Sequence, residues 1–158
     1  MTWELDGLTS KQSAAWGLFQ KGIPAIEIAR RMETSRQYIH QTLKVAETKI
    51  AHNLLEVATS SGLQIRSLKP EKGVLLGFNT ALGRDVVLTY TVRHGIRTWY
   101  WYDEPEQVKD QKLLEDAKRY LLDEADERGI PLTAEERKLQ PAKLARIVFS
   151  KLMPGETF

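Results

Sequence analysis

The sequence predicts an α+β protein in which an N-terminal all-helical domain precedes a small antiparallel sheet and C-terminal helices. Three observations lead to this prediction. Apolar residues recur at helical spacing as far as Val57, form short β-branched and aromatic runs from Leu63 to Tyr102, and return to helical spacing after Glu104. A break of small residues at 59–62 separates the first two regions. We therefore place one domain at residues 1–58 and a second at residues 63–158.

Capping residues divide the N-terminal region into three helices. Thr9 and Gln12 form a capping-box pattern at the start of the first helix, which ends at Gly22. The second helix begins at Pro24, a favourable residue for a first turn. Ser35 is a favourable N-cap for the third helix.

One apolar stripe runs along the third helix. Its members recur at spacings of three or four residues: Ile39, Leu43, Ala46, Ile50, Leu54 and Val57. A three-helix unit cannot cover a stripe of this length. We expect its outer half, from Ile50 to Val57, to pack on the second domain or on the same helix of a twin subunit.

The second domain is expected to hold about four antiparallel strands. The dipeptide His94-Gly95 suits a two-residue hairpin turn, which would pair Tyr90 with Trp99 and Leu88 with Trp101. After Glu104, one helix is predicted to end at Arg128-Gly129 and another to run from Pro141 to Leu152. Between them, Thr133 and Glu136 form a second capping-box pattern.

The composition excludes several kinds of site. The chain has 158 residues, no cysteine and a formal net charge of +2, so disulfides, zinc–thiolate sites and thiol nucleophiles are excluded. The first twenty residues lack both a basic start and an apolar run. No stretch approaches the ~18 apolar residues of a membrane span. We therefore expect a cytoplasmic protein without a membrane partner.

Charge is distributed unevenly along the chain. Residues 61–102 carry six Lys/Arg against two Asp/Glu, whereas residues 103–158 carry ten against thirteen. The middle of the chain is therefore basic and its end acidic. We do not expect the last third to contact a polyanion.

The three N-terminal helices meet the requirements of a protein that reads the major groove of DNA, in which the second helix braces the third. Ala29 provides a small residue where two helices cross, and Ile39 and Leu43 anchor the third helix inward. Polar and basic side chains are left to face outward: Arg36, Gln37, His40, Gln41 and Lys44.

A family resemblance is carried by Leu8-Thr9, Gln12, Gly22-Ile23-Pro24, Glu27-Ile28-Ala29, Met32, Ser35-Arg36-Gln37-Tyr38-Ile39, Ala46 and Lys49-Ile50. This pattern resembles the helix-turn-helix of sigma-factor region 4, of LuxR-type regulators and of related archaeal regulators, over about 50 residues. The resemblance implies a regulator of transcription whose third helix is the recognition helix for double-stranded DNA. In two places the chain departs from the family: Met32-Glu33-Thr34 replaces the usual Leu-Gly turn, and Tyr38 stands where a small hydroxyl residue is common. Nothing transfers to the region after Gly62.

Side-chain chemistry suggests a division of roles at this surface. Arg36 can form a bidentate pair with guanine, and Gln37 or Gln41 can do so with adenine. His40 lies among them on the same face. Four further cations suit phosphates, which position a protein without specifying sequence: Lys44, Arg30, Arg31 and Lys49. The alternative for Arg36, Gln37, His40 and Lys49 is an ordinary solvated position on a helix surface.

The expected partners follow from the small size of a helix-turn-helix. Such units usually bind as dimers to two half-sites, so we expect a homodimer. We expect the second domain to dimerise, to sense a small-molecule or protein effector, or both.

No cofactor, metal site, catalytic residue or enzymatic activity is expected. The histidines His40, His52 and His94 fall on different elements, and no Gly-rich phosphate loop is present. Two alternatives to a regulator remain. One is a protein–protein adaptor that reuses the fold, and the other is a nucleic-acid enzyme that the first domain targets to its substrate.

Overall fold

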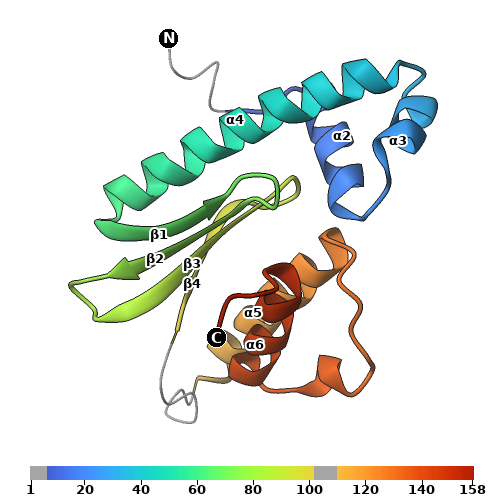
Figure 1. The fold of residues 1–158 in the computed structure, drawn as a ribbon. Coiled ribbons are helices and arrows are strands. Elements are labelled where there is room, and N and C mark those ends of the chain that lie inside the picture. The colour runs from blue at the N-terminus through green and yellow to red at the C-terminus, as the bar shows by residue number, and fades with distance from the viewer. Residues whose placement is uncertain (1–6, 102–109) are drawn as a thin grey trace. The chain divides into compact units, whose positions relative to one another are not determined.

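The computed structural model describes residues 7–101 and 110–158. Helices, a four-stranded antiparallel sheet and further helices follow one another along the chain, which confirms the predicted α+β class (Figure 1). The chain forms two compact units, Met1–Tyr100 and Trp101–Phe158. In the described part of the chain, no helix is long and apolar enough to cross a membrane.

Three helices open the first unit: α2 (Ser10–Gln20), α3 (Ala25–Arg31) and α4 (Arg36–Ser60). The predicted capping box begins α2, because the Gln12 N–H donates to Thr9 Oγ1 (3.2 Å) and the Thr9 N–H donates to Gln12 Oε1 (3.0 Å). Ser35 caps α4 as predicted, and its Oγ accepts the N–H of Tyr38 (3.1 Å).

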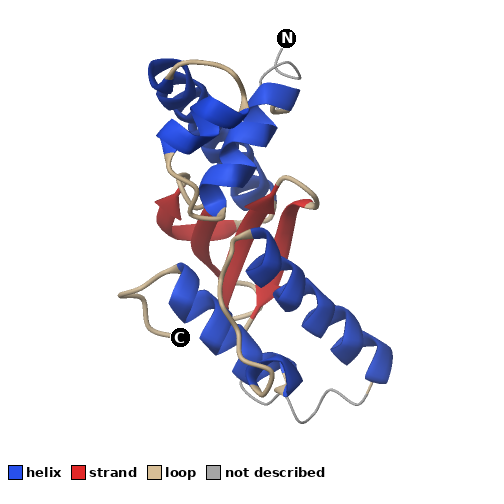
Figure 2. Ribbon diagram, turned by 90° about the vertical axis from the view of Figure 1, so that its right-hand side faces the viewer, coloured by secondary structure: helices blue, strands red, loops and turns tan. Residues whose placement is uncertain are grey.

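The sheet is a simple meander of β1 (Leu63–Lys69), β2 (Val74–Asn79), β3 (Arg84–Thr91) and β4 (Gly95–Tyr100), seen as one continuous layer in Figure 2. Each tight turn between strands ends in a glycine with positive φ: Gly73 (64°), Gly83 (63°) and Gly95 (67°). Glycine adopts this left-handed backbone without the steric penalty that a Cβ atom brings.

The predicted register of the β3–β4 hairpin is wrong. Thr91 pairs with Gly95 and Tyr90 with Ile96, so that Val87 rather than Tyr90 lies opposite Trp99. The loop holds the three residues 92–94, and Gly95 follows it in the left-handed conformation. A three-residue loop closed by a left-handed residue is a common hairpin connection, and it moves the register away from that of a two-residue turn.

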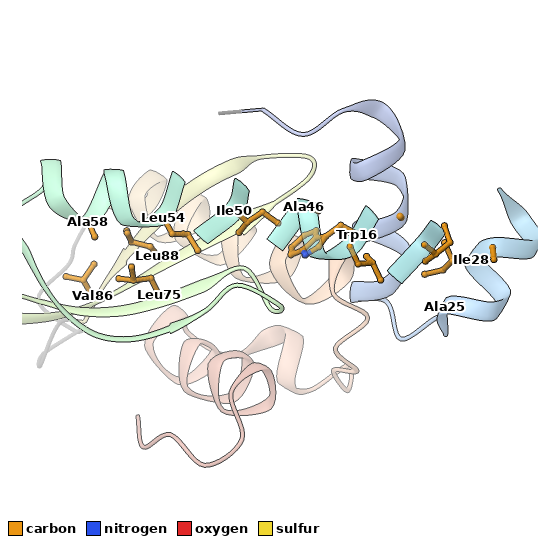
Figure 3. Close-up of a cluster of buried hydrophobic side chains, with 14 of the residues drawn as sticks. Trp16, Ala25, Ile28, Ala46, Ile50, Leu54, Ala58, Leu75, Val86 and Leu88 are labelled. Atoms are coloured by element: carbon orange, nitrogen blue, oxygen red, sulfur yellow. The ribbon is translucent and has the colours of Figure 1, made fainter. Parts of the chain in front are cut away.

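Helix α4 contributes one apolar stripe to two halves of a single core. Near its N-terminus, Ile39 and Leu43 join a cluster with Ile28 of α3. Farther along, Ile50, Leu54 and Ala58 are fully buried in the same cluster, which on the sheet side contains Leu75, Val86 and Leu88 (Figure 3). The outer half of the stripe therefore packs on the sheet of its own chain, the first of the two expected alternatives.

This packing explains why the boundary between compact units differs from the predicted domain boundary. Residues 59–62 connect α4 to β1 inside the first unit, and the division falls at Tyr100 instead. The break of small residues is a sharp turn with Gly62 at φ 67°. It does not separate two cores, because α4 lies along the sheet that follows it (Figure 1).

Trp16 joins α2 to the turns at one end of the sheet. Its ring is 2% exposed and packs edge-on against Tyr90, with 5.3 Å between ring centroids. A Cβ atom at Gly73 would lie 2.9 Å from the Trp16 ring and 2.9 Å from the carbonyl oxygen of Tyr90. Beside this contact, Gln20 Nε2 donates to the carbonyl of Glu71 (2.8 Å). Side-chain packing and a hydrogen bond thus attach the helices to the sheet at a second point, besides the continuity of α4.

Replacing Gly73 with Ala should destabilise the first unit by about 2–4 kcal/mol, because the new methyl group overlaps Trp16 and the backbone is left-handed. Gly83→Ala is the matched control, since Gly83 has the same backbone conformation and nothing within 4 Å of its Cβ position. It should cost about 1 kcal/mol. Urea unfolding followed by tryptophan fluorescence measures both. Equal losses for the two variants would contradict the close contact with Trp16.

The second unit contains α5 (Gln111–Glu127), the short 3-10 helix η2 (Glu136–Lys138) and α6 (Pro141–Leu152). The predicted start of its first helix at Glu104 lies outside the described residues. Asp110 caps α5 by accepting the N–H groups of Lys112 and Leu113. The predicted capping box of Thr133 and Glu136 is present, but it opens only η2.

A buried ion pair lies near the end of α5. Arg128 Nε donates to Glu124 Oε2 at 2.8 Å, and the two side chains are 2% and 0% exposed. A buried charge that loses its partner is strongly unfavourable, because the interior does not solvate it. The pair therefore ties the C-terminal turn of α5 to a fixed geometry.

Arg128→Met should destabilise the second unit by about 3–5 kcal/mol, because it removes the guanidinium that compensates the charge of the buried Glu124 carboxylate. Arg137→Met is the matched control: Arg137 pairs with Asp126 at the same 2.8 Å, but both side chains are exposed, and the expected loss is about 0–1 kcal/mol. Differential scanning calorimetry compares the two. A small effect of Arg128→Met would contradict the dependence of the buried carboxylate on Arg128.

Candidate nucleic-acid interface

The outward surface at the start of α4 presents the predicted side chains in two neighbouring rows. Arg36, His40 and Lys44 follow one another at intervals of four residues, which places them on one ridge of the helix. Gln37 and Gln41 form the next row. All five residues are exposed, whereas Ile39, Thr42 and Leu43 on the opposite side are buried. The structure therefore brings these five predicted residues together on one face.

The described part of the chain provides no partners for most of the polar side chains on this face. Within residues 7–101 and 110–158, no hydrogen bond or ion pair engages the side chains of Arg36, Gln37, His40 or Gln41. The face offers a guanidinium and an ammonium as donors, and two amides and an imidazole that both donate and accept. Amide and guanidinium groups match the donor and acceptor patterns of base edges in the major groove.

The connection between α3 and α4 is four residues long and adopts a compact, hydrogen-bonded form. The Thr34 N–H donates to the Ala29 carbonyl (2.9 Å) and the Glu33 N–H to the Arg30 carbonyl (3.3 Å), the pattern of a Schellman motif. Glu33 has a φ of 54°, and it is the one non-glycine residue in the described chain with positive φ. It therefore adopts the conformation that a glycine usually supplies at the end of a helix.

Helix α3 carries the two predicted arginines on its outer surface, where both bind one carboxylate. Arg30 Nε donates to Glu27 Oε2 (2.9 Å), and Arg31 Nε donates to Glu27 Oε1 (3.2 Å). The arginine side chains remain 73% and 48% exposed. Hydrogen bonds from Arg30 and then Arg31 hold the pKa of Glu27 at about 2, so its carboxylate stays ionised at neutral and mildly acidic pH.

Lys49 lies apart from the other predicted residues. Its ammonium group donates to Gln12 Oε1 (2.9 Å) and to the carbonyl of Gly7 (3.3 Å). It therefore links α4 to the capping box at the start of α2. Both acceptors are neutral, so they satisfy N–H donors of Lys49 without compensating its charge, and its contact with phosphate stays a prediction.

Sequence reasoning missed two features of this region. Tyr38 is 40% exposed beside the two rows, and a helical projection from Ser35 would have placed it at their edge. Glu27 stands in the predicted family pattern without a role of its own. Its spacing of three and four residues from Arg30 and Arg31 was the signal for the ion pairs.

The carboxylate of Glu47 on α4 interacts electrostatically with Glu71, which lies in the turn between β1 and β2. Burial raises the pKa of Glu47 above its ordinary value, and the negative charge of Glu71 raises it further, whereas Lys44 lowers it. Lys44 is therefore close to an opposing charge, unlike the residues nearer the start of α4.

Comparison of the chain with models of known protein families, with curated proteins and with solved structures found no match. Among the residues that the structure describes, no group of three His, Asp or Glu side chains could hold a metal ion. The interpretation of this surface therefore depends on its own geometry and chemistry.

Glu47→Gln should raise the melting temperature at pH 7, because a pKa raised by folding means that the folded state disfavours the ionised carboxylate. The gain should shrink as pH falls through the raised pKa toward the ordinary value of 4.5, below which Glu47 is protonated in both states. Thermal melts at several pH values measure this dependence. Glu56→Gln, an exposed position on the same helix, should give no such gain, and a gain for Glu47→Gln that does not vary with pH would argue against the electrostatic cause.

Proposed function

We propose that this protein is a sequence-specific, double-stranded DNA-binding regulator of transcription that reads the major groove with the first three turns of α4. The observation that carries the proposal is the exposed face formed by Arg36, Gln37, His40 and Gln41, whose side chains have no partner within the described residues. A capped helix with such a face, braced by a short helix across a four-residue connection, has the parts of a helix-turn-helix.

The proposal divides the interface by chemistry. Arg36 and the two glutamines would contact base edges, since bidentate pairs with guanine and adenine need planar groups of this kind. Phosphates, which fix the register of the protein on the duplex, would be contacted by Lys44, Arg30, Arg31 and Lys49. His40, between Arg36 and Lys44 on the same ridge, would lie over the groove edge.

The expected partners and setting remain part of the proposal. We propose a homodimer on two half-sites, because a single unit of this size contacts little DNA. The stripe that first suggested a twin helix is already covered by the sheet, so a dimer would use another surface. We also propose that the protein is cytoplasmic and that an effector acts on the region after Gly62.

The test is selection of bound duplexes from a random DNA pool, followed by affinity measurements against salt. The wild-type protein should enrich one motif, with affinity that falls steeply as salt rises. Arg36→Ala should relax one position of that motif and lose about 1–3 kcal/mol of discrimination there. Arg119→Ala is the matched control, because it removes an exposed arginine from α5.

The outcomes distinguish the proposed regulator from a protein–protein adaptor and from a nucleic-acid enzyme. If no motif is enriched and Arg36→Ala and Arg119→Ala bind duplex DNA equally, α4 does not read bases. The protein–protein adaptor would then be the better explanation. If duplexes are cleaved or modified when a divalent ion is added, the first three helices serve to target an enzyme.

A further inference from the structure

The outer surface of α3 holds one carboxylate between two guanidinium groups. Glu27 accepts from Arg30 through both carboxylate oxygens, and its Oε1 also accepts from Arg31. The three side chains lie on the exposed side of the helix, opposite Ala25, Ile28 and Ala29, which are buried. None of this pairing is shielded by a core, because the arginine side chains are 73% and 48% exposed.

The pairing changes what the arginines can offer to a phosphate. A bidentate carboxylate occupies the same fork of N–H donors that a phosphate would use. It also reduces the charge of the cluster from +2 to +1, by two arginines against one glutamate. A duplex that approaches α3 therefore meets guanidinium groups that are already bound to an internal anion.

We infer that Glu27 competes with DNA phosphate for Arg30 and Arg31 and thereby limits the strength of DNA binding without affecting which sequence is read. This inference rests on the proposed function and adds a regulatory residue to that interface. Phosphate contacts contribute to cognate and non-cognate binding alike. Glu27 would therefore lower both affinities by the same factor and shorten residence on non-cognate DNA.

Competition with phosphate would give Glu27 an effect on DNA binding that a purely structural ion pair would not have. Loss of a helix-stabilising pair would lower the melting temperature but would leave the salt dependence of DNA binding unchanged. Release of a competing anion would make that dependence steeper, because one more phosphate could be neutralised. The slope of log affinity against log salt distinguishes the two.

The experiment compares wild type and Glu27→Gln on one duplex that carries the selected motif and one scrambled duplex, over a range of salt concentrations. For Glu27→Gln we expect the slope to steepen by about 0.9 and the affinity at 0.1 M salt to rise about eightfold, equally on both duplexes. Glu56→Gln is the matched control: it removes the same charge from an exposed position on α4. Glu56 lies about 30 Å along that helix from Arg36, beyond the screening length of about 10 Å.

Thermal melts will show whether Glu27→Gln is folded. If Glu27→Gln does not fold, Arg30→Gln provides an independent measurement. Arg30→Gln leaves Glu27 paired with Arg31 alone, so the slope should become shallower than that of wild type. If wild type binds DNA but Glu27→Gln has an unchanged slope, or raises affinity on only one duplex, the inference is overturned. If wild type itself does not bind duplex DNA at low salt, the proposed function fails instead.

Discussion

The first unit depends on the burial of one helix stripe by two different partners. The N-terminal half of α4 packs against α2 and α3, and its C-terminal half packs against the sheet. Neither partner covers the helix alone. If Ile50, Leu54 and Ala58 remained exposed to solvent, the folded state would lose about 25 cal/mol of stabilising free energy for each Å² of apolar surface left in water. The shared helix therefore makes one folding unit of two regions that the sequence suggests are separate.

Trp16 of α2 reinforces this arrangement from within the same core. It fills the space that Gly73 leaves open, and its ring meets Tyr90 of β3. The three helices, which include the exposed face at the start of α4, are thus attached to the sheet in two places: through α4 itself and through Trp16 of α2. The base-reading role proposed for this face would need such a support, because hydrogen bonds to bases tolerate little error in position.

Much of the architecture could be predicted from the sequence because local signals were strong. The capping residues Thr9 and Ser35 act within three residues of themselves, and the stripe of α4 repeats over about five turns. The outward face at Arg36 to Lys44 followed from the same periodicity. Predictions were less successful where tertiary contacts or turn geometry decide the outcome. The β3–β4 register depends on the conformation of Gly95, and the hydrogen bond between Lys49 and Gln12 joins residues 37 positions apart, which no local pattern indicates. The left-handed backbone of Glu33 could not be predicted either, because residues other than glycine seldom adopt it.

The length of α4 has a mechanical consequence. A helix of 25 residues is about 37 Å long and behaves as a stiff rod. The sheet holds one end of this rod, and the exposed face occupies the other. A rotation of about 5° at the sheet would displace the far end by about 3 Å, more than the range over which a hydrogen bond forms. The second attachment to the sheet, through Trp16 and Gln20 of α2, opposes such a rotation, so the exposed face keeps its position relative to the sheet.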